Sequence, residues 1–192
     1  MNKMNALLAA TMIAGAAIAL PASATTYVIS QTIGAGSVTG TITTDNTIGA
    51  IASTNITAFN LILNDGTATF NLTNSNGAVG IAGSALTATA TGLFYNFSAA
   101  GTNYALFQAP NLGSSINYFC LQTSSCYNPT STPGAGMRIQ GALLNNSQTG
   151  NVQFGAVAAV PETATWGMMI LGFGMIGAAA RSRKVKTTVA YA

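Results

Sequence analysis

The stretch FNLILNDGTATFNL, residues 59–72, decides the fold class. Apolar and polar side chains alternate through Phe59, Leu61 and Leu63, and the alternation stops at Asn64-Asp65-Gly66 before a second segment runs from residue 67 to 72. Alternate side chains of a strand lie on opposite faces, and Asn, Asp and Gly are the residues that turns between antiparallel strands require. The stretch therefore predicts a β-hairpin.

The same pattern of short alternating segments and turn residues extends over residues 26–157. Further strands are expected at residues 38–43, 86–97, 104–107, 116–121, 137–144 and 151–157, with a flexible loop at 129–136. Turn signals recur about every 8–12 residues, as in sandwiches, and no fixed repeat is present. The sequence predicts an all-β domain, an antiparallel two-sheet sandwich or jelly roll.

Charged residues are scarce and unevenly placed. They make up 5% of the chain, against about 25% in ordinary domains. Five of the six basic residues lie near the two ends of the chain: Lys3, Arg181, Arg183, Lys184 and Lys186. Because the region between has only Arg138 as a cation, it offers no basic face to phosphates, and a nucleic-acid partner is not expected.

Residues 1–24 have the order of a secretory signal peptide. Lys3 precedes an apolar run at residues 6–20, and Pro21 is followed by the small-residue triplet Ala22-Ser23-Ala24. Signal peptidase recognises this order, so we expect cleavage after Ala24 and export of residues 25–157. The alternative is a retained membrane helix, for which the run is short.

The two cysteines, Cys120 and Cys126, fit an exported domain. An oxidising compartment favours a disulfide between them, which would close a small loop. Two separate thiols are the alternative. Zinc is excluded because the chain has no histidine to complete a four-ligand site.

The C-terminal region has the pattern of a membrane anchor. Residues 166–180 are all apolar or glycine, which predicts a transmembrane helix at 165–180. Trp166 suits the lipid boundary on one side, and the basic residues Arg181, Arg183 and Lys184 suit the cytoplasmic side. This orientation agrees with export of the β-domain.

Residues 158–192 resemble the PEP-CTERM sorting signal in its PEPxA variant. The resemblance rests on a motif, the apolar helix and the RSRK cluster at 181–184, and the motif residues are Val160, Pro161, Glu162, Ala164 and Trp166. Thr163 stands where the family usually has a second proline. The resemblance implies an exported Gram-negative protein that an exosortase-type enzyme processes, with Glu162 as a recognition residue.

Two inner stretches are similar to the exported portions of the same family. They are residues 36–66 and NYFCLQTSSC at 117–126. Such portions have no assigned activity. The resemblance implies a location, first at the inner membrane and then in the cell envelope or outside the cell.

The sequence offers little for catalysis. Without histidine, the commonest general base and the Ser-His and Cys-His systems are absent. Asp45 and Asp65 each lie in a turn dipeptide, and two isolated carboxylates make a weak cation cage. We expect no enzyme activity, no cofactor and no metal.

The expected function is that of a non-catalytic envelope or extracellular-matrix protein, with polysaccharide as a further partner. The alternative is a carbohydrate-binding or ice-binding module. It would use either a row of Thr87, Thr89 and Thr91 or an aromatic cluster, which otherwise belongs to the core. The cluster comprises Tyr95, Phe97, Tyr104, Phe107, Tyr118, Phe119 and Tyr127.

Overall fold

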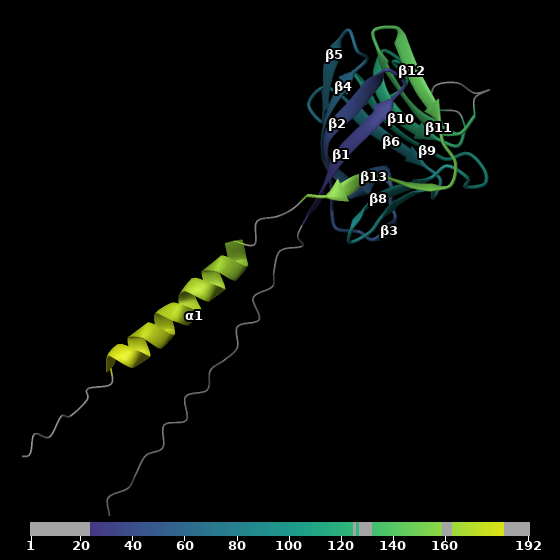
Figure 1. Cartoon of the computed structure of the whole chain (residues 1–192). Helices are drawn as coiled ribbons and strands as arrows, with labels where there is room; N and C mark the ends of the chain where they lie inside the picture. The colour runs from purple at the N-terminus through teal and green to yellow at the C-terminus, as the bar shows by residue number, and fades with distance from the viewer. Residues whose placement is uncertain (1–23, 125, 127–131, 159–162, 183–192) are drawn as a thin grey trace, which may run out of the picture. The chain divides into compact units, whose positions relative to one another are not determined.

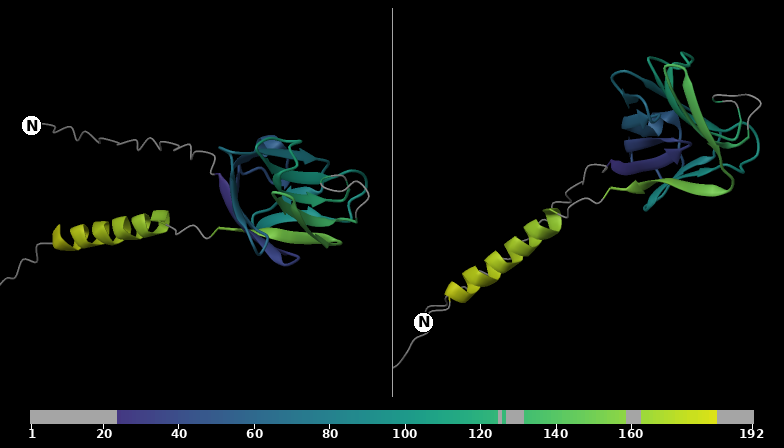
Figure 2. Two further views of the ribbon diagram at one scale, coloured as in Figure 1. Left: turned by 90° about the horizontal axis from the view of Figure 1, so that it is seen from above. Right: turned by 45° about the horizontal axis from the view of Figure 1, so that its top comes forward.

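The computed structural model describes residues 24–124, 126, 132–158 and 163–182. The chain divides into two compact units, Met1–Val157 and Ala158–Ala192, which are described separately. The described part of the first unit consists of two antiparallel β-sheets (Figures 1 and 2). The prediction of an all-β, two-sheet domain is confirmed.

The first sheet, sheet A, has eight strands among the described residues. In spatial order they are β3 (Gly49–Ala50), β7 (Leu86–Ala88), β8 (Gly92–Asn96), β13 (Asn151–Val157), β1 (Thr25–Ile33), β2 (Gly36–Thr44), β4 (Ile56–Asn64) and β5 (Thr69–Thr73). A single 3-10 turn, η1 (Ser53–Asn55), lies between β3 and β4. First and last strands of the domain are therefore neighbours.

Sheet B has five strands in the described part. Their order is β12 (Ala142–Ser147), β11 (Gly134–Ile139), β10 (Asn117–Gln122), β9 (Tyr104–Ala109) and β6 (Ala78–Ala82). Of the two arrangements left open by the sequence, sheets of eight and five strands agree with a sandwich.

The hairpin predicted from residues 59–72 is formed by β4 and β5. Leu61 lies opposite Leu72 in the ladder, and Gly66 adopts a φ of 94° in the turn. Asp65 closes this turn, because its Oδ1 accepts hydrogen bonds from the backbone N–H groups of Thr67 and Ala68. The local sequence thus fixes both strands and the connection.

One apolar core joins the two sheets. Alternate residues of β1, β2 and β4 point inward, and Tyr27, Ile42 and Leu61 are fully buried. They meet the inward side chains of sheet B, where Phe107 contacts Phe59 of sheet A with ring centroids 5.3 Å apart. The core is contiguous across the sandwich.

Two strand predictions were too long. Residues 86–97 form two strands, because the chain turns between Thr89 and Gly92 and the backbone N–H of Thr89 donates to the Gly92 carbonyl at 2.9 Å. Residues 137–144 also form parts of two strands, separated by a turn in which Gln140 and Gly141 have φ of 45° and 111°. Positive φ at consecutive residues is typical of a two-residue hairpin turn.

Other boundaries also differ from the prediction. The loop expected at 129–136 ends earlier, because Gly134 is already the first residue of β11 and pairs with Gln122 of β10. Asp45 does not start a tight hairpin, since the chain passes through β3 and η1 before β4 returns to β2. Strands β1, β3 and β6 lie outside the predicted strand ranges; β1 does alternate, whereas the β6 sequence AVGIA lacks alternation.

In the second unit the described residues form one helix, α1 (Thr163–Ser182). Successive residues of a helix are about 100° apart, so its exposed apolar side chains lie around the whole circumference. They are Trp166, Met169, Ile170, Leu171, Phe173, Met175 and Ile176.

The predicted helix at residues 165–180 is therefore present, but its predicted transmembrane character is not supported. Among the described residues, no helix combines the length and apolar character needed to cross a membrane. Glycines dilute the apolar side chains of α1, at positions 167, 172, 174 and 177.

Replacement of Gly40 by alanine should destabilise the domain. Gly40 lies in β2 with a φ of 132°, and an added Cβ would collide with the carbonyl oxygen of Asn60. We expect the free energy of unfolding to fall by about 1–3 kcal/mol, measured by urea denaturation. Gly49→Ala is the control, because Gly49 also has positive φ but an added Cβ there meets open space. An equal loss in both variants would contradict the packing argument.

Candidate functional site

The predicted sorting motif is only partly described. Val160, Pro161 and Glu162 lie outside the described residues. Ala164 and Trp166 belong to the first turns of α1, where the Trp166 side chain is 63% exposed.

The flanking basic and cleavage residues are divided in the same way. Arg181 is exposed in the last turn of α1, whereas Arg183 and Lys184 lie outside the described residues. At the other end, the predicted cleavage residue Ala24 is exposed and immediately precedes β1.

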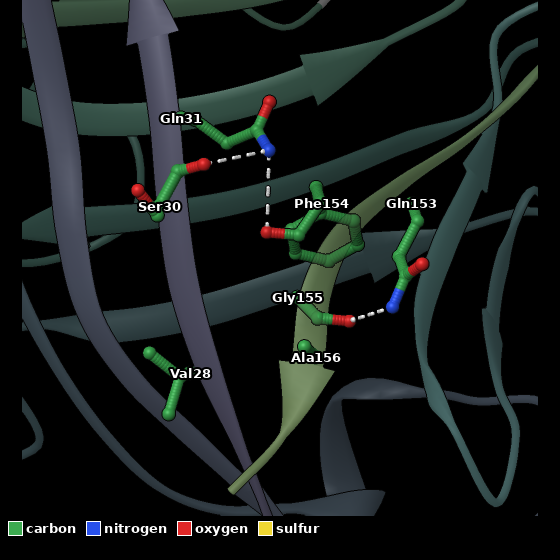
Figure 3. A pocket seen from close by; sticks show the side chains of 7 residues that line it. All are labelled: Val28, Ser30, Gln31, Gln153, Phe154, Gly155 and Ala156. Carbon is green, nitrogen blue, oxygen red and sulfur yellow. Dashed lines mark hydrogen bonds between the residues drawn. The ribbon is translucent and has the colours of Figure 1, made fainter.

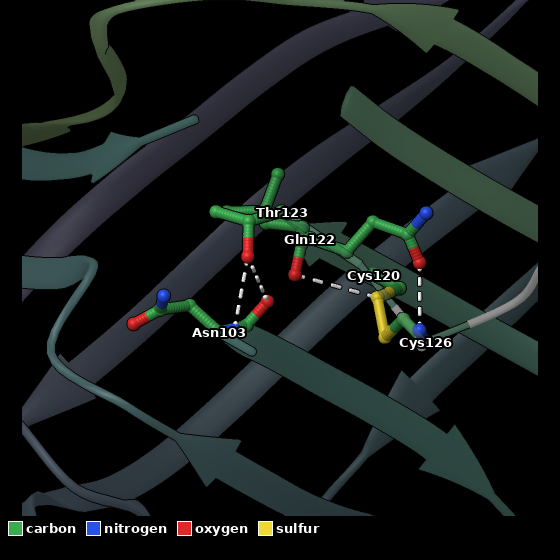
Figure 4. The surroundings of a disulfide bond; sticks show 6 residues. Asn103, Cys120, Gln122, Thr123 and Cys126 are labelled. Carbon is green, nitrogen blue, oxygen red and sulfur yellow. Dashed lines mark hydrogen bonds between the residues drawn. A yellow bond between two sulfur atoms is a disulfide. The ribbon is translucent and has the colours of Figure 1, made fainter. Parts of the chain in front are cut away.

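The disulfide predicted between Cys120 and Cys126 is confirmed (Figure 4). Cys120 is buried in β10, and the two Cα atoms are 6.3 Å apart. The backbone N–H of Cys126 donates to the side-chain oxygen of Gln122 at 2.7 Å. A loop this short contributes about 2 kcal/mol on the chain-entropy account, so the bond is a local clip.

A buried amide lies beside the clip. The Asn103 side-chain oxygen accepts from the backbone N–H groups of Ser84 and Ala85, and its NH2 group donates to the carbonyl of Ala100 at 3.0 Å. The backbone N–H of Asn103 donates to the hydroxyl of Thr123 at 3.0 Å. Through its side chain and its backbone, this one uncharged residue thus links three connections between strands.

The aromatic cluster belongs largely to the core. Tyr95, Phe97, Phe107 and Phe119 are at most 1% exposed, and Tyr118 is 3% exposed. Tyr104, the first residue of β9, is half-buried, and Tyr127 lies outside the described residues. Because buried rings cannot stack on a ligand, the five buried residues do not form a sugar platform, and of the described cluster only Tyr104 has an accessible ring.

The threonine row is not a row. Thr87 lies in β7, but Thr89 and Thr91 lie in the turn before β8. The Thr89 hydroxyl accepts from the backbone N–H groups of Thr91 and Gly92, so it organises the turn. These three residues do not form the flat array that ice binding would need.

Both aspartates of the β-domain are turn residues, Asp45 exposed and Asp65 partly exposed. The Asn55 amide and the Thr47 hydroxyl and backbone N–H bond to Asp45 and lower its pKa. The backbone N–H groups of Ala68 and Thr67 and the Thr67 hydroxyl lower the pKa of Asp65 in the same way. Within the described ranges, no group of three or more His, Cys, Asp or Glu side chains could hold a metal ion.

The β-domain has a hollow of about 230 Å³ at the junction of β1 and β13, here called the β1/β13 notch (Figure 3). The two strands pair only from Tyr27 opposite Val157 to Ile29 opposite Gly155. Beyond Ile29 they diverge, and β13 has a register shift against β8 between Gln153 and Gly155. The notch is lined by Val28, Ser30, Gln31, Gln153, Phe154, Gly155 and Ala156.

Two glutamine amides are held at the notch by their NH2 groups. Gln31 donates to the carbonyls of Phe154 at 3.3 Å and Ser30 at 3.1 Å. Gln153 donates to the carbonyl of Gly155 at 3.2 Å and to that of Thr91 at 3.4 Å. Hydrogen bonding within the described part of the chain leaves both side-chain oxygens, as well as the Ser30 hydroxyl, without a partner.

This notch was not predicted from the sequence, although β1 contains one signal for it. Tyr27, Ile29 and Ile33 mark the inward face of the strand, and Gln31 interrupts that apolar series. The partner residue Gln153 has no comparable signal, because its position follows from the bulge in β13.

The chain matches no protein-family model, no curated protein and no solved structure.

Asn103→Ala should destabilise the domain strongly. The variant leaves the buried N–H of Ala85 and the part-buried N–H of Ser84 without their acceptor, and each unsatisfied buried group costs about 1–3 kcal/mol. We expect the free energy of unfolding, measured by urea denaturation, to fall by about 3 kcal/mol. Asn60→Ala, on the exposed face of β4, should change it by less than about 0.5 kcal/mol. Similar losses in the two variants would refute the role of the network.

The turn at Asp65 should make stability depend on pH. Its pKa is lowered from 3.8, so the ionised form stabilises the fold above that pH and the contribution is lost as pH falls further. The thermal midpoint should drop in this acid range. Asp65→Asn does not titrate and should show a smaller drop, and Asp45→Asn/Asp65→Asn a smaller one still. Superimposable pH profiles for the three proteins would count against the assignment.

Proposed function

We propose that the chain is an exported, non-catalytic protein of the cell envelope or extracellular matrix, delivered through a C-terminal PEP-CTERM-type sorting signal. The observation that carries the proposal is the order of segments: a signal-peptide pattern, a β-domain, the VPETATW motif, an apolar segment and a basic cluster. Signal peptidase and an exosortase-type enzyme are the proposed processing partners. Neither catalysis nor nucleic-acid binding is part of this function.

The start of the β-domain supports the proposed cleavage site. β1 begins at Thr25, directly after Ala24, and all nine of its residues pair with β2. Cleavage after Ala24 would therefore remove the N-terminal segment without removing a residue of the sheet. The oxidised pair Cys120 and Cys126 is also consistent with an oxidising compartment.

The properties of α1 support handling at a membrane. The helix carries apolar side chains around its circumference, with Trp166 near its start and Arg181 in its last turn. Tryptophan and arginine are enriched at the two boundaries of a lipid layer. We propose that α1 contacts the inner membrane before processing and that the β-domain then passes to the envelope or the medium.

The non-catalytic part of the proposal rests on the two aspartates. Each carboxylate accepts turn hydrogen bonds that lower its pKa, whereas a general acid near neutral pH needs a raised pKa. The alternative of a carbohydrate- or ice-binding module loses its aromatic and Thr87–Thr91 bases, for the reasons given above.

Mass spectrometry of protein recovered from cells and medium tests the proposal. In a Gram-negative host with an exosortase, the full-length gene should yield protein that starts at Thr25, and the form in the medium should lack α1. Pro161→Ala/Glu162→Ala should reduce this form at least several-fold. Thr163→Pro, which restores the usual motif, should increase it.

Thr188→Ala, outside the motif, is the matched control and should leave processing unchanged. Retention of Met1 in every fraction would contradict export. An intact C-terminus in all secreted protein, with no effect of the motif variants, would contradict the sorting role.

A further inference from the structure

We infer that the β1/β13 notch is a binding site for one ring of a neutral carbohydrate, with adjacent sugar units lying across the outer face of sheet A. The inference adds a ligand to the proposed function and rests on it in one respect, that the domain meets its ligand outside the cell. The site differs from the aromatic cluster and from the threonine row considered in the sequence.

The side-chain oxygens of two glutamines at the notch are hydrogen-bond acceptors with a fixed orientation. Gln31 and Gln153 both donate to backbone carbonyls of β13, at 3.3 Å and 3.2 Å. An amide held by its NH2 group has its oxygen fixed, with lone pairs left for an incoming donor. In Figure 3 the two oxygens point away from one another, so they would accept from sugar hydroxyls at opposite margins of the notch, and the Ser30 hydroxyl adds a group that can donate or accept.

The backbone of β8 and β13 shapes the notch. A Cβ at Gly92 would coincide with the NH2 group of Gln153, so the glycine in β8 leaves the space that this amide occupies. The β1/β13 ladder ends at Ile29 opposite Gly155, next to the register shift of β13 against β8 between Gln153 and Gly155. Pre-set polar groups reduce the ordering cost of binding.

The notch carries no charge. None of the seven lining residues is ionisable. The described aspartates, Asp45 and Asp65, lie in turns outside the lining, and Arg138 lies in β11 of the other sheet. A site without any charge gives no advantage to an acidic or basic ligand, which would lose its hydration uncompensated. The ligand class is therefore a neutral polyhydroxylated molecule.

The notch is small and has apolar side chains on one side. The volume of about 230 Å³ lies below the range of about 300–1,000 Å³ typical of drug-sized ligands, which suits a single ring. Val28 is 47% exposed and lies opposite Ala156 in the ladder, so two apolar side chains are available for the C–H face of that ring.

The outer face of sheet A continues the polar surface away from the notch. Ser30 lies opposite Thr39, which lies opposite Ile62 and then Asn71. The next row runs from Val28 through Thr41 and Asn60 to Thr73. Strands are about 4.8 Å apart, so each row extends across β1, β2, β4 and β5 without a charged residue. A chain of sugars would find hydroxyl, amide and methyl groups along it.

Titration of the full-length protein with neutral hexasaccharides tests the inference. The probes are the hexamers of β-1,4-linked glucose, mannose and N-acetylglucosamine, with hexagalacturonate as the acidic comparison. Binding is measured by saturation-transfer NMR and calorimetry in a detergent without a sugar headgroup, since such headgroups would compete. At least one neutral probe should bind, and it should bind more tightly than hexagalacturonate.

Gln153→Met and Gln31→Met keep side-chain length but remove the acceptor, and each should weaken binding about five- to tenfold. Gln140→Met, in the exposed turn between β11 and β12, is the matched control and should bind as the wild type. Gln153 is exposed, so its variant supplies the test if Gln31→Met does not fold.

No binding of any neutral probe, tighter binding of hexagalacturonate, or unchanged binding in a folded Gln153→Met protein would overturn the inference. These results are independent of processing. If protein that starts at Thr25 binds no sugar, the sugar site is refuted and the sorting proposal stands. If protein recovered from cells retains Met1 but binds sugar, the sorting proposal is refuted and the sugar site stands.

Discussion

The pairing of β1 with two strands of unequal reach is the constraint on which the β-domain depends. β1 pairs with β2 over nine residues but with β13 over only three. The long ladder fixes which side chains of β1 enter the core, and the short ladder joins the end of the domain to its beginning. Where the short ladder stops, the Gln31 amide bonds to the Phe154 carbonyl in place of a backbone N–H. The notch is a direct result of this substitution.

Hydrogen bonds between uncharged groups hold the turns and strand connections of this domain, where other domains also use charged residues. Asn103 holds three connections together from a buried position, and the Thr89 hydroxyl organises a turn. Such bonds are not screened by salt, unlike exposed ion pairs, and each satisfies a backbone group that would otherwise be costly to bury. A surface with few charges is compatible with the fold because amides and hydroxyls, together with the two aspartates Asp45 and Asp65, satisfy the backbone groups of the turns.

Alternation and turn residues predicted much of the fold. The hairpin at 59–72 follows from them, because β4 alternates between buried and exposed residues. Residues 104–107 and 151–157 also form strands, although β9 has no exposed residue and β13 has two consecutive buried ones. The merged strands at 86–97 and 137–144 were wrong, since Thr89-Ala90-Thr91 and Gln140-Gly141 continue the alternation in sequence although the chain turns there. Pairing partners decide such turns, and a single sequence does not contain them.

The candidate site was harder to predict than the fold. The disulfide followed from two cysteines and an export signal, and it is confirmed. The notch needs residues from β1, β8 and β13, which are far apart in the chain and meet through a bulge. Only Gln31, a polar residue in an inward series, gave a local indication. Composition drew attention to aromatics instead, and these form the core.

The adjacency of the first and last strands has a mechanical consequence. Tyr27 lies opposite Val157, so the polypeptide enters and leaves the β-domain at the same end of two neighbouring strands inside sheet A. Tension between those two points would separate β1 from β13 one pair at a time, as a zipper opens, and would not load all three pairs together. Force transmitted through only one of the two ends would leave this ladder unstretched.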